Sequence, residues 1–220
     1  MEFETIAQIL IYYIHAPMGG VALLAGGVAL IAKKGNSIHK KAGRIFYYAM
    51  LISALTAFVI SVMPGHESSF LFSIGMFSTY FLLGGYRSLK FKNKTHNIFL
   101  DKLIAIIMVI TGLVMIIYPI IFDKNIDIVL LVFGLVGISF GIRDIRLFQN
   151  KKLLREKWLK LHIGKMTGGY IASITAFFVV NQFLPYLFNW LLPGVIGSIY
   201  ITYWIKKLNR KKSVANTLYN

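Results

Sequence analysis

Seven apolar runs separated by short polar connections dominate this chain and limit the folds open to it. Most of them approach the roughly 20 residues that a helix needs to cross about 30 Å of hydrocarbon. We therefore expect an all-α fold, a polytopic membrane helix bundle with seven transmembrane helices. The expected spans are Ile6 to Ala32, Ile45 to Met63, Phe70 to Tyr86, Leu103 to Phe122, Ile126 to Ile142, Ile163 to Leu184, and Trp190 to Ile205.

The composition supports a membrane protein. Of the 220 residues, 57% are hydrophobic and only 15% are charged, which is outside the usual range of soluble globular domains. The net charge of +16 falls in the short segments between the apolar runs, so we attribute it to membrane topology and expect no nucleic-acid partner. The chain has no cysteine, which excludes disulfides, iron–sulfur clusters held by thiolates and covalently attached c-type haem. Non-covalent haem b stays open.

The positions of the basic residues predict the orientation. If alternate connections lie on opposite sides, all but one of the 24 Lys and Arg fall on one side, and only Lys124 falls on the other. The positive-inside rule then places the N-terminus outside and the C-terminus in the cytoplasm. We expect residues 1–205 to form the seven-helix transmembrane domain and residues 206–220 to form a loose, basic cytoplasmic tail.

Glycines and basic turns recur in a pattern that predicts helical hairpins. We expect three of them (first helix with second, third with fourth, fifth with sixth), with the seventh helix added. Small residues in the first span, and Gly134, Gly137 and Gly141 in the fifth, favour close helix packing. The segment from Leu147 to His162 is too charged to span, and its apolar residues recur at helical spacing. It is typical of a helix lying at the cytoplasmic interface of the bilayer against anionic headgroups.

His15 stands about 15 Å from the outer end of the first span, near the middle of the bilayer. An ionisable group at that depth indicates a functional site by default, with a proton, a quinone or a metal as its ligand. The alternative is a neutral imidazole bonded to a carbonyl freed by a kink at Pro17, or to a Ser or Thr of another span. In either case we expect His15 to point into the bundle.

His39 and His162 share features that the other histidines lack. Each begins an apolar helix at the basic side, has glycines nearby and is followed eight residues later by a tyrosine, Tyr47 or Tyr170. Two imidazoles at equal depth on two helices suit axial ligation of haem b, with the cations around them, Arg44 and Lys165 among them, binding the propionates. The alternative is that these histidines only face lipid headgroups.

Other polar residues suggest little chemistry. Asp101 lies beside Lys102 at a helix mouth and is read as a local charge partner, so no pair of carboxylates within the membrane indicates a cation pump. The fingerprints of zinc proteases, serine hydrolases and nucleotide-binding folds are absent. Whether the protein is an enzyme stays open.

Three stretches, His15 to Gly20 (HAPMGG), Lys34 to Arg44 (KGNSIHKKAGR) and Trp158 to Tyr170 (WLKLHIGKMTGGY), resemble those of a family of predicted bacterial membrane proteins with no assigned activity. The resemblance implies a multi-pass protein of the bacterial inner membrane. A looser similarity is to cytochrome b561-type and ferric-reductase-type proteins, in which histidine pairs hold haem on each side of the bilayer. This chain departs from that pattern because His66 lies much shallower than His15, so the likeness implies at most one haem.

Three classes of function therefore remain. The leading one is electron transfer with haem b, or a quinone, near the cytoplasmic face. The second is a non-redox transporter or sensor of a proton or small solute that uses His15. The third is an assembly partner of a larger membrane complex, or of a second copy of this chain, in which the histidines have no chemical role.

Overall fold

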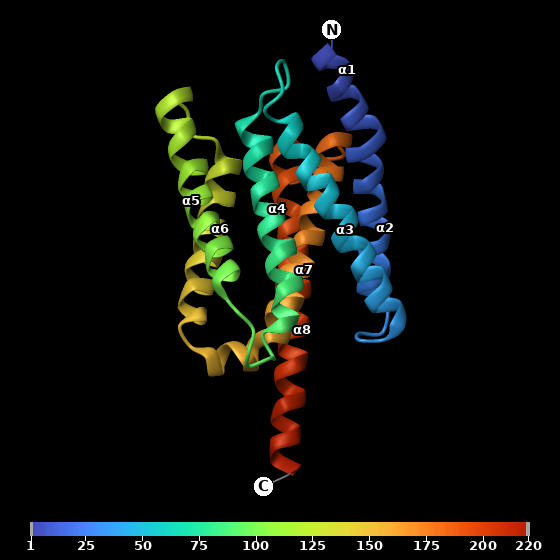
Figure 1. Cartoon of the computed structure of the whole chain (residues 1–220), viewed down its shortest axis with the longest axis vertical. Coiled ribbons are helices and arrows are strands. Elements are labelled where there is room, and N and C mark those ends of the chain that lie inside the picture. Colours follow the sequence, from blue (N-terminus) through green and yellow to red (C-terminus); the bar gives the residue numbers. More distant parts are fainter. Residues whose placement is uncertain (1, 219–220) are drawn as a thin grey trace.

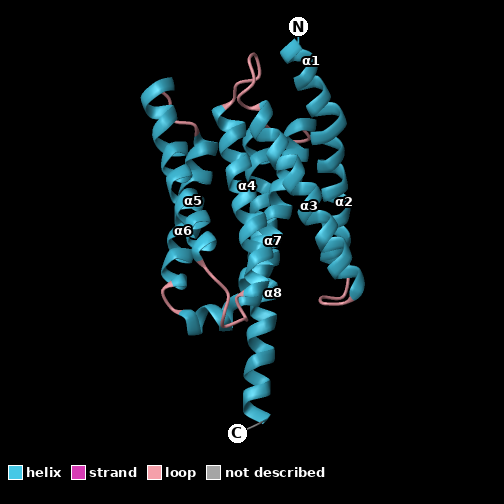
Figure 2. Cartoon of the chain, in the orientation of Figure 1, coloured by secondary structure: helices cyan, strands magenta, loops and turns pink. Residues whose placement is uncertain are grey.

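The computed structural model describes residues 2–218, and over these residues the chain forms one bundle of seven helical rods (Figures 1 and 2). Each predicted span corresponds to one rod. The first rod joins α1 (Glu2–Ile9), a π-helical turn η1 (Leu10–His15) and α2 (Ala16–Ile31). The others are α3 (Ser37–Ile60), α4 (Ser69–Arg87) with a 3-10 turn η2 (Ser88–Lys90), α5 (Phe99–Tyr118) with a π-helical turn η3 (Pro119–Asp123), α6 (Ile128–Phe148), α7 (Lys151–Asn181) and α8 (Tyr186–Leu218).

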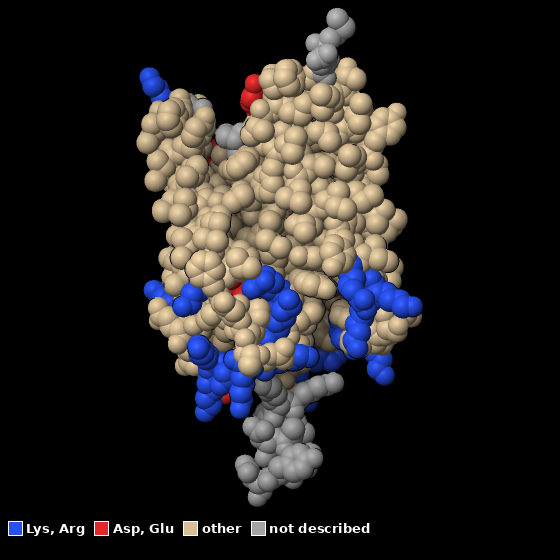
Figure 3. Space-filling view, in the orientation of Figure 1, with Lys and Arg blue, Asp and Glu red and all other residues tan. Residues whose placement is uncertain are grey.

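Five helices of the described chain are long and apolar enough to cross a membrane. They are Phe3–Ile31, Ser37–Ile60, Phe99–Phe122, Ile128–Phe148 and Lys151–Asn181. Much of their surface consists of exposed large apolar side chains, and Ile31, Val180 and Leu24 are the most exposed of these. Lys and Arg gather at the end of the bundle opposite the N-terminus and leave an uncharged band above them (Figure 3). This is the surface of a multi-pass membrane protein.

Polar residues in the connections fix where the helices begin. Four helices start at a side chain that accepts a hydrogen bond from a backbone N–H of the first turn, which supplies a partner that the helix itself lacks. The four capping residues are Asn36 before α3, Ser68 before α4, Asp127 before α6 and Asn150 before α7.

The first rod changes its hydrogen-bond pattern just before Pro17, where a kink was predicted. Proline has no N–H to donate, and the backbone adjusts one residue earlier, where the Ala16 N–H bonds to the carbonyl of Ile11 instead of that of Tyr12. This wider spacing defines η1, the π-helical turn that ends at His15. The expected distortion is thus a π-helical turn within a continuous rod.

The pairing of the helices differs in part from the predicted hairpins. The first rod and α3 pack together extensively, as expected. The next most extensive interface, however, joins α5 to α6, whereas α4 packs mainly on α7, and α7 packs on both α4 and α8. The prediction failed because it paired helices across the basic turns alone. The short connection on the other side of the bundle, between η3 and α6, also brings two helices together.

Glycines explain the close contact between α5 and α6. A Cβ atom on Gly112 would lie 2.7 Å from the carbonyl oxygen of Gly134, and a Cβ on Gly134 would lie 2.8 Å from that of Gly112. A Cβ on Gly141 would approach the carbonyl oxygen of Ala105 at 2.9 Å. The prediction that small residues allow close packing in the fifth span is therefore confirmed.

The apolar face of the segment predicted to lie at the cytoplasmic interface packs on protein. Leu154 and Leu147 are buried in a cluster with Phe91, and Trp158 and Leu161 pack against it. The helical spacing of these apolar residues was read correctly, but the surface that they cover belongs to the connection between α4 and α5 and to α6. The tail also differs, because α8 continues as a helix to Leu218 where a loose segment was expected.

The reciprocal contact of Gly112 and Gly134 can be tested by adding a single methyl group. We expect Gly112→Ala to destabilise the protein by about 1–3 kcal/mol, because each neighbour that the new Cβ meets is backbone or a packed side chain. Thermal unfolding in detergent measures this. Gly20→Ala is the matched control, since a Cβ on Gly20 would meet nothing within 4 Å. Equal stability of the two variants would contradict the packing described here.

Candidate functional site

Two histidines from distant parts of the sequence lie at the basic end of the bundle. His39 lies in the first turn of α3, where its own backbone N–H bonds to the Asn36 cap. His162 lies in α7, and the two imidazoles are near enough for their charges to interact. The side chains are half-buried rather than directed out into the headgroup region.

Both rings are held in the same way. Nδ1 of His39 lies 2.9 Å from the carbonyl oxygen of Ala29, and Nδ1 of His162 lies 3.0 Å from that of Gly85. A carbonyl only accepts, so each Nδ1 carries the proton, and each neutral ring keeps a lone pair on Nε2. Among the described residues neither Nε2 has a hydrogen-bond partner. A backbone carbonyl on one nitrogen and a free lone pair on the other is how proteins orient histidine for a metal.

Each histidine has an open glycine near it. Gly43 lies one turn into α3 from His39, and a Cβ there would meet nothing within 4 Å. On α7 the same holds for Gly164, two residues after His162, whereas Gly168 packs on Phe81 and Gly169 packs on Leu82.

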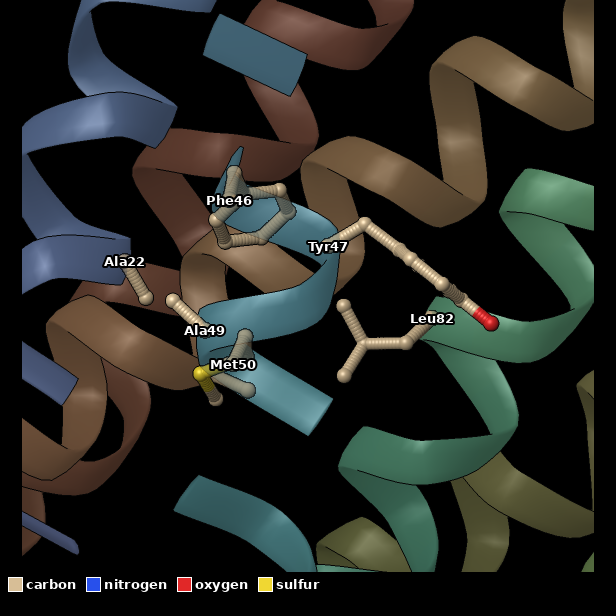
Figure 4. Close-up of a cluster of buried hydrophobic side chains, with 7 residues drawn as sticks. Ala22, Phe46, Tyr47, Ala49, Met50 and Leu82 are labelled. Atoms are coloured by element: carbon tan, nitrogen blue, oxygen red, sulfur yellow. The ribbon is translucent and has the colours of Figure 1, made fainter. Parts of the chain in front are cut away.

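The two tyrosines predicted to accompany the histidines point to different neighbours. Tyr47 leaves α3 toward α4, where its ring stacks on Tyr86 at 4.3 Å between centroids (Figure 4). The Tyr170 ring packs directly on Gly26, since a Cβ added to Gly26 would lie 2.3 Å from that ring. The Tyr170 and Phe46 rings pack edge to face. Both tyrosine rings therefore pack between neighbouring helices.

The two cations predicted to bind the propionates, Arg44 and Lys165, lie in different environments. Arg44 is exposed and remains available to a negatively charged group. Lys165 is not, which corrects the sequence-based expectation. Its side chain is only 9% exposed, and its ammonium forms an ion pair with Asp144 of α6 and lies 3.8 Å from the centre of the Tyr80 ring. An ammonium buried this deeply needs a counter-ion inside the protein.

Asp144 is the centre of a buried polar group that sequence reasoning missed. Its Oδ2 accepts hydrogen bonds from the Tyr80 hydroxyl at 2.7 Å and from Lys165. It was overlooked because Arg143 and Arg146 surround it and the segment reads as a basic connection. The available signal was the spacing from Gly137 and Gly141, which places Asp144 on the same buried face of α6.

Asp101 is the second buried carboxylate, and its partners also differ from the expected one. It receives two parallel hydrogen bonds from Arg87, at 2.8 and 2.9 Å, and it lies 3.1 Å from Nε2 of His96. Lys102, the expected partner, is exposed. Arg87 follows the apolar run of α4, and the hydrogen bonds to Asp101 raise the pKa of its guanidinium, so this cation stays charged.

Gly84 and Gly85 place the histidine and the lysine of α7 against α4. A Cβ on Gly84 would lie 2.7 Å from Nζ of Lys165, and a Cβ on Gly85 would clash with Met166. Gly85 also provides the carbonyl to which His162 bonds. One pair of small residues thus positions both polar groups of α7.

The remaining two histidines, His15 and His66, each have a hydrogen-bond partner within the protein. His15 turns toward α3, as predicted, where its Nδ1 lies 2.9 Å from the carbonyl oxygen of Ser53 and 3.4 Å from the hydroxyl of Thr56. These bonds to a carbonyl and to Ser and Thr hydroxyls of another helix match the alternative to a ligand site. His66 pairs with Glu4 at 3.0 Å at the far end of the bundle. In the described part of the chain no three metal-ligating side chains come together.

The pairing of Asp144 with Lys165 predicts a strong energetic coupling. Lys165→Met alone should cost about 3–5 kcal/mol, because it leaves a buried carboxylate without its cation. In the double variant Lys165→Met/Asp144→Leu we expect a loss smaller than the sum of the single losses by about 1–3 kcal/mol. Unfolding in detergent measures each variant.

The pair Glu4 and His66 at the surface is the matched control, and its coupling should be much smaller because solvent screens the Glu4 carboxylate. Additive losses for Asp144 and Lys165 would show that the two charges do not depend on each other.

The comparisons with known proteins agree with a membrane protein. Residues 12–102 match the model of a family described as "Predicted membrane protein (DUF2306)". No curated protein and no solved structure matches the chain, so the looser likeness to cytochrome b561-type proteins finds no support. The match runs from η1 to the start of α5 and includes His15 and His39, whereas His162 lies beyond it. The expected resemblance is thus confirmed: over residues 12–102 this chain is similar to the DUF2306 family of predicted membrane proteins.

Proposed function

We propose that this membrane protein belongs to an electron-transfer system and binds one haem b through His39 and His162 near its basic face. The observation that carries the proposal is the state of the two rings. Each Nδ1–H is bonded to a backbone carbonyl, and each Nε2 keeps a lone pair without a protein partner among the described residues. Two such nitrogens from two helices are the ligand set of a six-coordinate haem.

Other residues fit this ligand in part. The open side of Gly43 leaves room beside His39, and Arg44 with its neighbours Lys40 and Lys41 is exposed at the same end of the bundle, where propionates need cations. Lys165 has no part in this because Asp144 neutralises it. When bound, the haem supplies a one-electron redox centre; the protein supplies the two nitrogens, their orientation and a largely apolar surrounding.

A quinone is the second ligand considered for this place, and the protonation of the rings disfavours it. A quinone carbonyl needs a hydrogen-bond donor. The free nitrogens of His39 and His162 are acceptors, because their protons lie on the opposite nitrogens. A Lewis acid such as haem iron suits these two lone pairs better.

We further propose that all seven rods span the bilayer, including α4 and α8, with the N-terminus outside and the C-terminus in the cytoplasm. The segregation of Lys and Arg to one end of the bundle supports this orientation (Figure 3). In a bacterium the protein would lie in the cytoplasmic membrane, and the haem site would face the cytoplasm.

The ligand assignment predicts a spectrum. The protein expressed with a supply of haem should show a Soret band and sharp reduced α and β bands, because two imidazoles make a low-spin iron. We expect His39→Ala and His162→Ala each to lose or shift these bands. Absorption spectra of the purified variants measure this.

His66→Ala is the control, since His66 is bonded to Glu4 at the opposite end of the bundle. Its spectrum should equal that of the parent protein. A colourless parent protein, or bands that survive both ligand substitutions, would refute the haem assignment.

The orientation predicts the behaviour of reporters fused to the C-terminus. A fluorescent protein fused after Asn220 should be fluorescent, and alkaline phosphatase at the same place should be inactive, because it folds only outside the cytoplasm. Phosphatase activity there would contradict an odd number of spans with an external N-terminus.

A further inference from the structure

A second polar site lies beside the histidine pair, and the proposed function does not use it. It consists of two buried ion pairs, Lys165 with Asp144 and Arg87 with Asp101, contributed by α4, α5, α6 and α7. Lys165 interacts electrostatically with Asp101 as well as with its own partner. The two pairs therefore form one electrostatic unit.

A small cavity separates the pairs. Asp101, Asp144 and Lys165 line it together with apolar residues such as Ile104 and Phe148, and its volume of about 10 Å³ is close to what one water molecule requires. Two carboxylates and an ammonium provide the polar partners that a buried water needs. A water here would join the two ion pairs by hydrogen bonds.

The site has one contact with the basic face. His96 lies in the connection between α4 and α5, its side chain is 12% exposed, and its Nε2 lies 3.1 Å from Oδ2 of Asp101. From there the polar groups lead inward through the cavity to Asp144 and to Tyr80, which lies two turns, or about 10 Å, deeper on α4 than Arg87. Tyr80 itself is buried among Phe77, Phe81 and Met108.

Only one of the two carboxylate oxygens of Asp144 accepts hydrogen bonds from the described residues. Lys165 and Tyr80 both bond to Oδ2, and no described residue bonds to Oδ1. A proton on Oδ1 would neutralise the carboxylate; Lys165 would then keep its hydrogen bond to Oδ2 and its contact with the Tyr80 ring, and Asp101 would be the anion that remains near it.

We propose that Asp144 is a proton-binding site in the membrane interior, loaded from the basic face through His96, Asp101 and the water of the cavity. A proton from solution binds Nδ1 of His96, and the Nε2 proton passes to Asp101. Asp101 gives a proton to the water, and the water gives one of its own to Oδ1 of Asp144. His96 and Asp101 return to their starting charge, and the net change is the protonation of Asp144.

The surrounding charges fit one-sided exchange. Arg87 and Lys165 stay in place as fixed cations facing the two carboxylates, and Arg143 of α6 is the further cation near Tyr80. Next to Tyr80 the described core is formed by the apolar side chains of Phe77, Phe81 and Met108. The site therefore loads and unloads protons at one face. It does so without haem, so its test and that of the haem proposal can fail independently.

Infrared difference spectroscopy of the haem-free, reconstituted protein tests the proposal. A pH jump to acid should produce a carbonyl band of a protonated carboxylic acid that shifts in D₂O. The isosteric variant Asp144→Asn should lose this band. In Asp101→Asn the band should still form, but at least about tenfold more slowly, because the relay lacks its middle carboxylate.

Glu4→Gln, at the opposite end of the bundle, is the control and should leave both the band and its rate unchanged. Thermal unfolding shows which variants are folded, and Tyr80→Phe, which keeps the ring beneath Lys165, should retain the band at a shifted frequency. The proposal is overturned if no band depends on Asp144, which would mean a permanently ionised structural pair. It is equally overturned if Asp101→Asn leaves the rate unchanged.

Discussion

The interior of this bundle is largely apolar, and a charge placed there needs a partner within the protein. Asp144 and Asp101 each have a buried cation and at least one further hydrogen-bond donor. An unpaired carboxylate at either place would cost several kcal/mol. The arrangement of α4, α5, α6 and α7 around these pairs is therefore tied to their chemistry, since moving any one helix would leave a charge alone.

Small residues make this arrangement possible. Gly84 leaves room for the ammonium of Lys165 on the surface of α4, and Gly85 lends its carbonyl to His162. The packing of α4 on α7 at these two glycines thus supports both the histidine pair and the buried ion pairs. Electron transfer at the histidine pair and proton exchange at Asp144 would influence each other electrostatically, because His162 and Lys165, the counter-ion of Asp144, lie one helical turn apart on α7.

The sequence predicts the helices well and their neighbours less well. The length of the apolar runs is a local property, and each run became a rod. The partners of Lys165 and Asp101 are not local, because each interaction joins two consecutive helices through residues that are 21 or 14 positions apart. Asp101 and Lys102 are adjacent in the sequence, so an ion pair between them was expected. Consecutive side chains of a helix point to different faces, and the two charges therefore do not meet. The spacing of Gly137, Gly141 and Asp144 was the one signal of a buried acid, and it becomes readable only when α6 is known to pack by its glycines.

The central claim is that α3 and α7 present two neutral imidazoles to one metal centre. Electron paramagnetic resonance of the ferric, haem-loaded protein tests it most directly, because the spectrum reports the number and type of axial ligands. The account predicts a low-spin signal typical of two histidine ligands. A high-spin, five-coordinate signal would contradict it, because it would mean that only one of His39 and His162 reaches the iron.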